Sequence, residues 1–185
     1  MKPALPRRYV ITPEPASASA ADCDAFLDRL SAVLARGDTL VQLRVKSFDA
    51  ATFARLAAGA QLMLNGPIDA QGVLQFERAG WHLDGATLRA TQQRPLPAER
   101  LLSAACHDAG DLRLAARAGA DFVTLSPVLP TLSHPGAPTL GWAQFGAWAA
   151  HAAMPVYALG GMTHAHLDEA RRHHAYGIAG IRGFW

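Results

Sequence analysis

The chain has 185 residues, a formal net charge of +2, 17% charged residues and a mean hydropathy of +0.07. This length fits one domain over residues 1–185, and the balance of apolar and charged residues excludes a disordered chain. The charge excludes a nucleic-acid-binding protein, because no cluster of lysine and arginine is present to neutralise phosphates. No apolar run approaches the roughly 20 residues that cross a bilayer, and no signal peptide is recognised, so a soluble cytoplasmic protein without a membrane partner is expected.

Short β-rich segments alternate with alanine-rich segments along the chain. We expect strands at residues 8–12, 39–46, 62–66, 80–84, 101–107, 121–128, 155–161 and 177–183. Helices are predicted at residues 22–36, 49–60, 108–118, 142–152 and 164–175, and a weak helix at most before Pro95 and Pro97. Capping residues agree: Asp22, Asp49 and Asp108 stand at helix starts, and Gly37 and Gly119 follow helix ends.

Alternating strands and helices predict an α/β fold with a parallel sheet. About eight strands spaced near 20 residues apart favour a compact, closed TIM (β/α)8 barrel over an open sheet. The sequence ends directly after the eighth strand, so the last outer helix is expected to be missing. Phe184 and Trp185 would cover its place, unless another surface does; an exposed apolar flank there would favour a homodimer.

The predicted strands end on polar residues or on glycine. These residues are Thr12, Lys46, Asn65, Asp84, His107, Ser126, Gly160, Gly161 and Arg182. In a closed barrel, the C-terminal ends of the strands together form a mouth, and the active site lies there. The pattern therefore indicates a functional site at the mouth.

The second predicted strand has one apolar and one polar face. Two sets of residues alternate along it: Val41, Leu43 and Val45, and then Gln42, Arg44 and Lys46. In a barrel, the apolar set packs outward on the helices and the polar set points inward and toward the mouth. Buried cations need anionic partners, which would be a carboxylate such as Asp84 or a phosphorylated ligand. The alternative is an edge strand with a solvated polar face.

Several segments together resemble the thiamine-phosphate synthase and TenI thiazole tautomerase family. They are QLRVK at 42–46, LN at 64–65, GWHL at 80–83, GADFVTLSPVLPTLSHPGAPTLGW at 119–142 and PVYALGGM at 155–162. The resemblance implies a TIM barrel whose mouth binds a pyrimidine diphosphate and a thiazole phosphate. The synthase joins the two with the help of Mg²⁺ and releases pyrophosphate, whereas the tautomerase transfers a proton on a thiazole carboxylate phosphate. The ending GIRGFW resembles the variants that are fused to Nudix hydrolases, although this chain has no Nudix box.

The resemblance also assigns roles to individual residues. Arg44 and Lys46 match the arginine and lysine that bind pyrophosphate in the family. Asn65 matches the asparagine of the family's Asn-Asp pair, and His107 matches the histidine that ends the fifth strand. The thiazole phosphate would be held by a second set of residues: Thr131, Ser133, Gly160 and Gly161. Further candidates are Gln42 and His82 as substrate-binding residues, although His82 could instead make a buried hydrogen bond. His134, in a proline-rich loop, is a candidate phosphate ligand or general acid.

The chain departs from the family pattern where the family holds its metal. Gly66 and Thr87 stand at the positions of the two aspartates that bind Mg²⁺. Asp84 is the nearby carboxylate that would have to replace them, although its register differs. Other departures are His134 for a lysine, Ala105 for a serine, Arg182 for a serine and Pro127 for the histidine of the tautomerase. Mg²⁺ is thus expected as a cofactor only with an altered site, and Gly66→Asp with Thr87→Asp would restore the carboxylates.

Three functions follow for a chain that binds small phosphorylated heterocycles. The first is a synthase-like transferase in which Arg44 and Lys46 neutralise the leaving pyrophosphate. The second is an isomerase or salvage enzyme with His107 or His134 as acid and base. The third is a binding protein for thiamine-related phosphates that has no catalytic activity.

Overall fold

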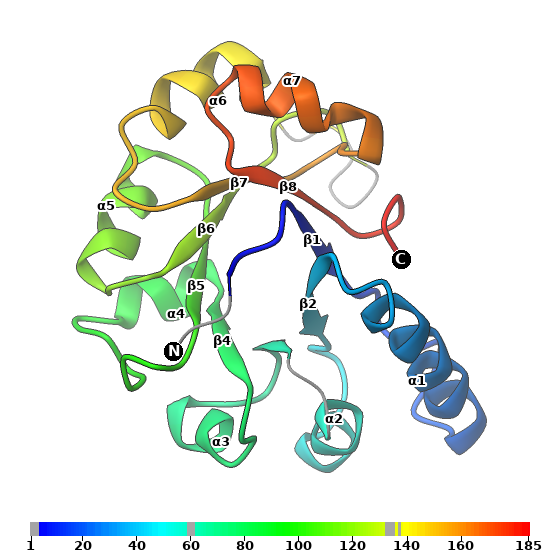
Figure 1. Ribbon diagram of the computed structural model, residues 1–185. Helices are drawn as coiled ribbons and strands as arrows, with labels where there is room; N and C mark the ends of the chain where they lie inside the picture. Colours follow the sequence, from blue (N-terminus) through cyan, green and yellow to red (C-terminus); the bar gives the residue numbers. More distant parts are fainter. Residues whose placement is uncertain (1–3, 59–61, 132–135, 137) are drawn as a thin grey trace.

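Eight parallel strands close into one barrel in the computed structural model, which describes residues 4–58, 62–131, 136 and 138–185 (Figure 1). Each strand pairs with the next one in the chain, and β1 pairs with β8. The strands are β1 Arg8–Ile11, β2 Thr39–Arg44, β3 Met63–Asn65, β4 Gly80–Leu83, β5 Leu102–Cys106, β6 Phe122–Leu125, β7 Val156–Ala158 and β8 Gly177–Gly180. The predicted TIM barrel is confirmed. Every strand ends earlier than predicted, because the last one to three residues of each predicted range belong to the loops of the mouth.

Helices follow the strands and form the outer ring. They are α1 Ala20–Leu34, α2 Ala50–Ala57, α3 Ala70–Leu74, α4 Gly85–Ala90, α5 Ala109–Arg117, α6 Gly141–Ala149 and α7 Leu167–Arg172, with a 3₁₀ turn η1 at His164–His166. The five helices predicted with bounds are confirmed, although the last one is split into η1 and α7. The short helix α3 was not predicted, because five residues are too few for a helical repeat to show.

The helix caps agree with the sequence in all but one case. Asp49 and Asp108 accept hydrogen bonds from the first turns of α2 and α5, and Gly37 and Gly119 have φ values of +73° and +72°. The prediction for Asp22 is wrong. Helix α1 begins two residues earlier, and the side chain of Ser19 accepts the hydrogen bond from the Asp22 N–H.

The strands separate two apolar cores. Inside the barrel lie Tyr9, Ile11, Leu40, Met63, Leu101, Phe122, Tyr157 and Ala179. Val41, Leu43 and Val45 belong to the other core, between the strands and the helices, and none of the three is exposed. The two faces of β2 therefore point as predicted. The alternative of an edge strand is wrong, since β2 pairs with both β1 and β3.

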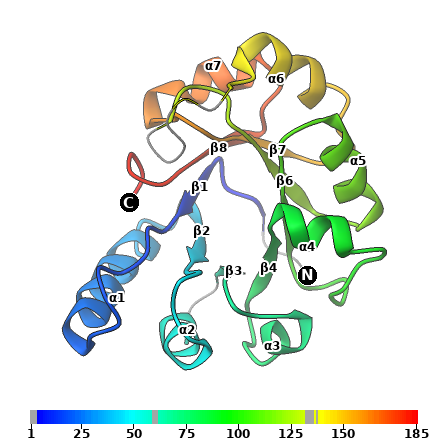
Figure 2. The same ribbon diagram turned by 180° about the vertical axis from the view of Figure 1, so that it is seen from behind.

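A C-terminal turn, residues 181–185, lies where an eighth outer helix would stand. Figures 1 and 2 both show it between α7 and α1. Phe184 is only 2% exposed, and the Trp185 ring stacks on Phe26 with 5.1 Å between centroids. Arg36 Nη1 and Arg29 Nη2 donate to the Phe184 and Trp185 carbonyl oxygens over 2.9 and 3.0 Å. The first alternative for this place is thus confirmed: the chain covers it with its own Phe184 and Trp185.

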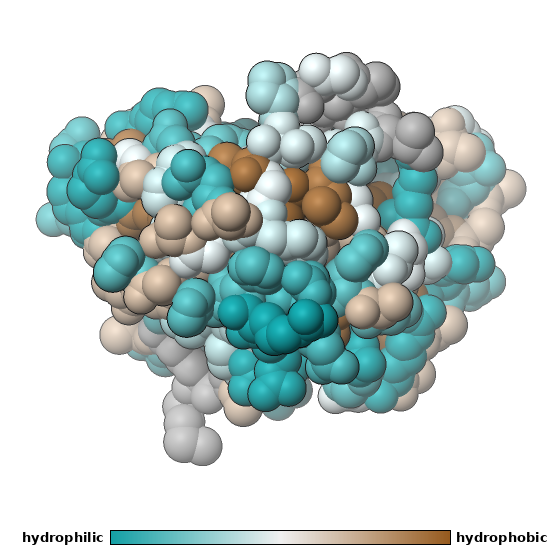
Figure 3. Space-filling model, turned by 90° about the horizontal axis from the view of Figure 1, so that it is seen from above, coloured by the Kyte–Doolittle hydropathy of each residue, from teal (hydrophilic) through white to brown (hydrophobic). Residues whose placement is uncertain are grey.

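The surface carries little exposed apolar area. Of the residues that the structure describes, Leu74 is the one large hydrophobic residue classed as exposed, at 38%. On the face shown in Figure 3, apolar areas are small and separated by polar residues. The apolar flank that would have favoured a homodimer is thus absent from the described part of the chain. None of the described helices has the length and apolar character needed to cross a membrane.

Candidate active site

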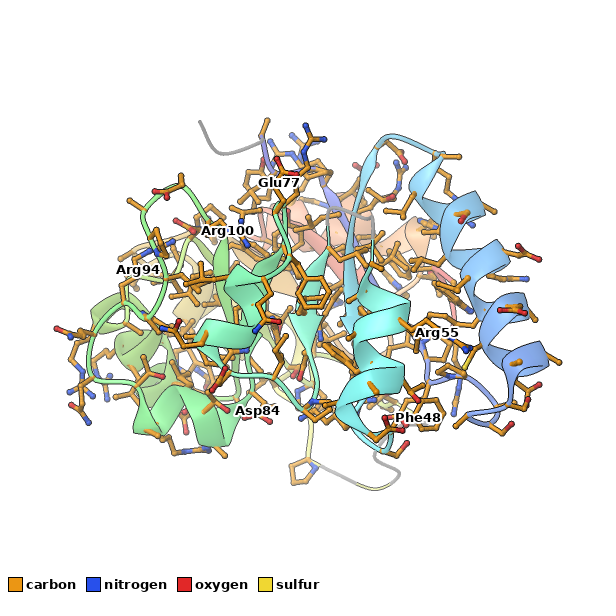
Figure 4. All side chains as sticks on the ribbon, turned by 90° about the horizontal axis from the view of Figure 1, so that it is seen from below. Phe48, Arg55, Glu77, Asp84, Arg94 and Arg100 are labelled. Atoms are coloured by element: carbon orange, nitrogen blue, oxygen red, sulfur yellow. The ribbon has the colours of Figure 1, made fainter. Side chains whose placement is uncertain are left out.

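The strand ends form a mouth at one end of the barrel. In Figure 4, Asp84 and Phe48 lie at this end, whereas Glu77 lies at the opposite end. Gln42 forms part of the floor: it is 1% exposed, and its Oε1 accepts a hydrogen bond from the Tyr9 hydroxyl over 2.8 Å. Arg44 ends β2 beside it and is half-buried. Its guanidinium has no hydrogen bond to any described residue and is available to a ligand.

Lys46 and Asp84 form an ion pair across the ends of β2 and β4. The Lys46 Nζ lies 2.8 Å from Asp84 Oδ2, and the two side chains are 39% and 38% exposed. Asp84 also caps helix α4, because its Oδ1 accepts from Thr87 N and Thr87 Oγ1 over 3.0 and 2.9 Å. Burial would raise the pKa of Asp84, but these donors and the Lys46 charge lower it well below its usual value. Asp84 is thus a partner of Lys46, as one prediction held, but Lys46 is exposed rather than buried.

Glu14 brings a second carboxylate to the same rim. Its Oε1 accepts from the Lys46 backbone N–H over 2.9 Å, and its Oε2 accepts from Ser47 Oγ. Burial alone would raise the pKa of Glu14, yet these hydrogen bonds and the charge of Arg44 lower it. Two cations and two carboxylates therefore face one another at this side of the mouth.

Asn65 and Gly66 stand at the end of β3, next to Arg44. Asn65 pairs with Arg44 in the sheet and is 7% exposed. Gly66 has no room for a side chain, because a Cβ there would lie 2.3 Å from the Val45 carbonyl oxygen and 2.4 Å from the Phe53 ring. The proposed restoration Gly66→Asp is therefore sterically blocked.

His82 lies on β4 beneath the mouth. It is 4% exposed, and its Nδ1 lies 2.8 Å from Ser103 Oγ on β5. Burial, together with the charges of Lys46 and Arg44, lowers its pKa to about 3, so the ring is neutral at physiological pH. The alternative prediction of a buried hydrogen bond is confirmed. A direct contact with substrate remains a prediction.

His107 lies at the end of β5, exposed at the mouth. Its Nδ1 lies 2.9 Å from the carbonyl oxygen of Ser126. A carbonyl oxygen only accepts, so Nδ1 carries the proton. In the neutral ring, Nε2 is then left as an acceptor that a ligand can reach. His107 has the geometry of a general base at the rim.

The turn after β7 lies against the loop that follows β6. Gly160 and Gly161 have φ values of +98° and +69°, and a Cβ at either would come within 2.8 Å of the 127–130 segment. Leu129 N donates to the Gly160 carbonyl over 3.1 Å, whereas no hydrogen bond of the described residues uses the Gly160 or Gly161 N–H. Thr131 follows in the same loop. Ser133 and His134, predicted as ligands, lie outside the described residues.

Arg182 is exposed in the turn after β8. Its guanidinium makes no hydrogen bond or ion pair with the described residues. The positive charge of Arg182 is therefore accessible to a ligand, and its role in binding phosphate stays a prediction. Across the barrel, the mouth thus presents the cations of β2, the free N–H groups after β7 and the exposed His107 after β5.

Comparison with known proteins identifies the family. A family model described as thiamine monophosphate synthase matches residues 9–184. The chain belongs to this family. The relative from Aquifex aeolicus named "Putative thiamine-phosphate synthase 2" is 31% identical over 189 residues, which cover 97% of this chain and 98% of that protein. The thiamine-phosphate synthase of Thermus thermophilus is 31% identical over 190 residues, covering 96% and 88% of the two chains.

Solved structures confirm the fold. Thiamine phosphate pyrophosphorylase from Pyrococcus furiosus aligns with a TM-score of 0.67 and 19% identity, over 95% of this chain and 85% of that one. N-acetylmannosamine-6-phosphate 2-epimerase from Clostridium perfringens aligns with a TM-score of 0.61 and 12% identity, over 95% and 86% of the chains. Since one barrel carries such different reactions, function has to be argued from the site.

Synthases of this family generally use Mg²⁺, but the residues present here do not fit that ion. No group of three or more His, Cys, Asp or Glu side chains that could hold a metal occurs in the described part of the chain. Gly66 and Thr87 offer no carboxylate, and Asp84 already accepts three hydrogen bonds. The Lys46 ammonium next to Asp84 would also repel a divalent cation.

Sequence reasoning missed two polar groups of the site. Glu14 lies two residues after Thr12, the last residue of the first predicted strand. Its place at the mouth could have been predicted if the residues just beyond each strand end had been considered as well. Thr124 lies on β6, where it pairs with Ala105, and its Oγ1 is buried without a hydrogen-bond partner among the described residues. No signal in the sequence distinguishes this hydroxyl from one that is satisfied.

Proposed function

We propose that this chain is a thiamine-phosphate synthase that joins hydroxymethylpyrimidine diphosphate to hydroxyethylthiazole phosphate and releases pyrophosphate. One observation carries the proposal: two anion-binding elements lie on the rim of a single barrel. They are the cations Arg44 and Lys46 at the end of β2 and the diglycine turn Gly160–Gly161 after β7, whose N–H groups make no hydrogen bond with the described residues. A reaction between two phosphorylated substrates needs two such elements.

The coupling makes one bond and breaks another. The ring nitrogen of the thiazole attacks the methylene carbon of the pyrimidine and becomes a thiazolium nitrogen, while the carbon–oxygen bond to pyrophosphate breaks. Negative charge grows on the leaving pyrophosphate, and Arg44 and Lys46 stabilise it electrostatically, with Asn65 as an orienting donor. No proton has to be removed, so the protein contributes position and charge rather than a base.

The second substrate would be bound at the turn after β7. Backbone N–H groups at Gly160 and Gly161 suit a phosphate, because glycine lets the anion approach the main chain closely. Thr131 and Ser133 would add hydroxyl donors, and Arg182 and His134 would add positive charge. Gln42 and His82 would line the floor beneath the pyrimidine.

A specific observation supports a second candidate, an isomerase that acts on a thiazole phosphate. The exposed His107 Nε2 is an acceptor that coupling does not require, whereas a tautomerisation needs a base. A binding protein without activity is the third outcome. We further propose that residues 1–185 form a single domain, that the protein is cytoplasmic and that it forms a homodimer. The ending GIRGFW supports a relation to the family variants that are fused to Nudix hydrolases.

A coupling assay tests the proposal. Purified protein is mixed with the two substrates and Mg²⁺, and thiamine phosphate is detected as fluorescent thiochrome. The Arg44→Ala, Lys46→Ala double variant is expected to lose about 100-fold or more in kcat, since it removes charge stabilisation from the transition state. Arg55→Ala, which changes an exposed arginine on α2 (Figure 4), should keep full activity. No thiamine phosphate from the wild type, with the thiazole phosphate still bound in calorimetry, would overturn the transferase in favour of the isomerase or the binding protein.

A further inference from the structure

We propose that Asp84 is an internal counter-ion of Lys46 rather than a metal ligand, so that phosphorylated ligands bind the mouth without a divalent cation and in competition with Asp84. The inference rests on the proposed function, because it concerns the same pyrophosphate site. It starts from the disagreement between the family's use of Mg²⁺ and the groups that this chain places there.

The first step concerns Gly66, one of the two positions where the family pattern has an aspartate. The Val45 carbonyl oxygen and the Phe53 ring fill the space that a Cβ would need. The position is closed, so a carboxylate is not merely lacking but excluded. Of the two carboxylates on this rim, Glu14 is already held by the Lys46 N–H and Ser47 Oγ, so a metal would have to rely on Asp84.

The second step concerns that single carboxylate. Asp84 Oδ1 accepts two hydrogen bonds from Thr87, at the second of the two positions, and this ties the carboxylate to the start of α4. Asp84 Oδ2 faces the Lys46 ammonium at 2.8 Å. Mg²⁺ would have to displace the Lys46 ammonium from Oδ2, the one oxygen of Asp84 that Thr87 does not use. Proteins hold Mg²⁺ through one or two carboxylates together with substrate phosphates, and here the one candidate carboxylate is already paired.

The third step is the charge balance of the rim. Arg44 and Lys46 carry two positive charges, and Glu14 and Asp84 carry two negative charges. Glu14 is held by Lys46 N–H and Ser47 Oγ, while Arg44 keeps its donors free. The Lys46–Asp84 pair is more than one third exposed on both sides, so solvent weakens it and an incoming anion can reach it. A polyanion that displaces Asp84 from Lys46 can pair with both Arg44 and Lys46, and only one exposed ion pair is lost.

Calorimetry with inorganic pyrophosphate tests this. The wild type should bind pyrophosphate in the presence of EDTA, and replacing EDTA by Mg²⁺ should not tighten binding. Asp84→Asn should bind about threefold to fivefold tighter in EDTA, because the competing charge is removed while asparagine still caps α4. Asp108→Asn, the same change at the cap of α5 and outside the ion pair, should leave the affinity unchanged. Circular dichroism of both variants checks that they fold.

The other results separate this inference from the proposed function. Binding that requires Mg²⁺ and is weakened in Asp84→Asn would make Asp84 a metal ligand and overturn the inference, while the synthase proposal stands. Binding in EDTA that Asp84→Asn leaves unchanged would also overturn it. No binding of pyrophosphate under either condition would remove the pyrophosphate site itself and overturn both proposals.

Discussion

Gly66 shows how one residue determines what a neighbouring site can hold. Its missing side chain makes room for the Phe53 ring, which is 1% exposed and packs beneath the end of β3. Gly66→Ala should therefore destabilise the protein by about 2 kcal/mol, because an added methyl group forces the ring and the Val45 carbonyl apart. Urea unfolding of the variant and the wild type measures this difference.

Gly85→Ala is the matched control for that substitution. Its added Cβ would meet only the end of the Arg89 side chain, at 2.8 Å, and that side chain can move. The position lies in helix α4, where alanine is preferred to glycine, so stability should stay the same or rise. Equal losses in the two variants would mean that Gly66 is not specially constrained.

His82 makes stability depend on pH. Its folded pKa of about 3 lies below that of an unfolded histidine, so the unfolded chain takes up a proton that the folded chain does not. Stability from this group is complete at neutral pH and is lost as the pH falls below about 6.5, by about 2 kcal/mol at pH 5. Urea unfolding at pH 7 and pH 5 should show a smaller difference for His82→Gln. A variant with the wild-type pH dependence would contradict this assignment.

The sequence predicted Arg44, Lys46, Asn65 and Asp84 as neighbours, because alternation along a strand and the common end of parallel strands fix where such side chains meet. It did not predict that Lys46 is exposed. That depends on where β2 stops, and the ladder ends at Arg44, two residues earlier than the alternating pattern. The occlusion of Gly66 depends on the ring of Phe53, a contact between separate elements that no local pattern contains.

Among the elements, the C-terminal turn, residues 181–185, covers the part of the barrel between α7 and α1 that an outer helix would otherwise cover. The Phe184 ring packs on Gly180 of β8 and lies 4.4 Å from the His164 ring between centroids. Phe184→Ala should destabilise the fold by about 3 kcal/mol, since it leaves a cavity between α1 and η1. Thermal and urea unfolding measure the loss. Leu74→Ala on α3 removes an exposed apolar side chain and should change stability by less than about 0.5 kcal/mol; a similar loss in both would show that the turn is not part of the core.

Helix positions were predictable to within a few residues wherever a cap and an apolar repeat occur together, as in α2 and α5. The end of the chain was less so. GIRGFW carries no helical repeat, so the sequence left open whether Phe184 and Trp185 or another surface covers the last place in the ring. The answer depends on Phe26 and Arg29 of α1 and on Arg36 just after it, which are distant in sequence.

For the whole molecule, the closed barrel followed from the number and spacing of strands rather than from any one of them. The pairing of β1 with β8 closes the sheet and brings residues from the start, middle and end of the chain to one mouth. There, two cations are balanced by two carboxylates from β1 and β4. This balance arises from three strand ends, those of β1, β2 and β4, and could be derived only after the barrel had placed them together.

The lack of space for a side chain at Gly66 also limits which substitutions at this position the fold can accept. Every glycine codon becomes an aspartate or glutamate codon by one base substitution, so an acidic residue is one genetic step away. That step is nonetheless blocked by the Phe53 ring and the Val45 carbonyl oxygen, so a smaller residue at 53 and a shift of the main chain at 45 would both be needed. A chain with Gly66 and Phe53 would therefore acquire an acidic group at position 66 only through a less stable intermediate.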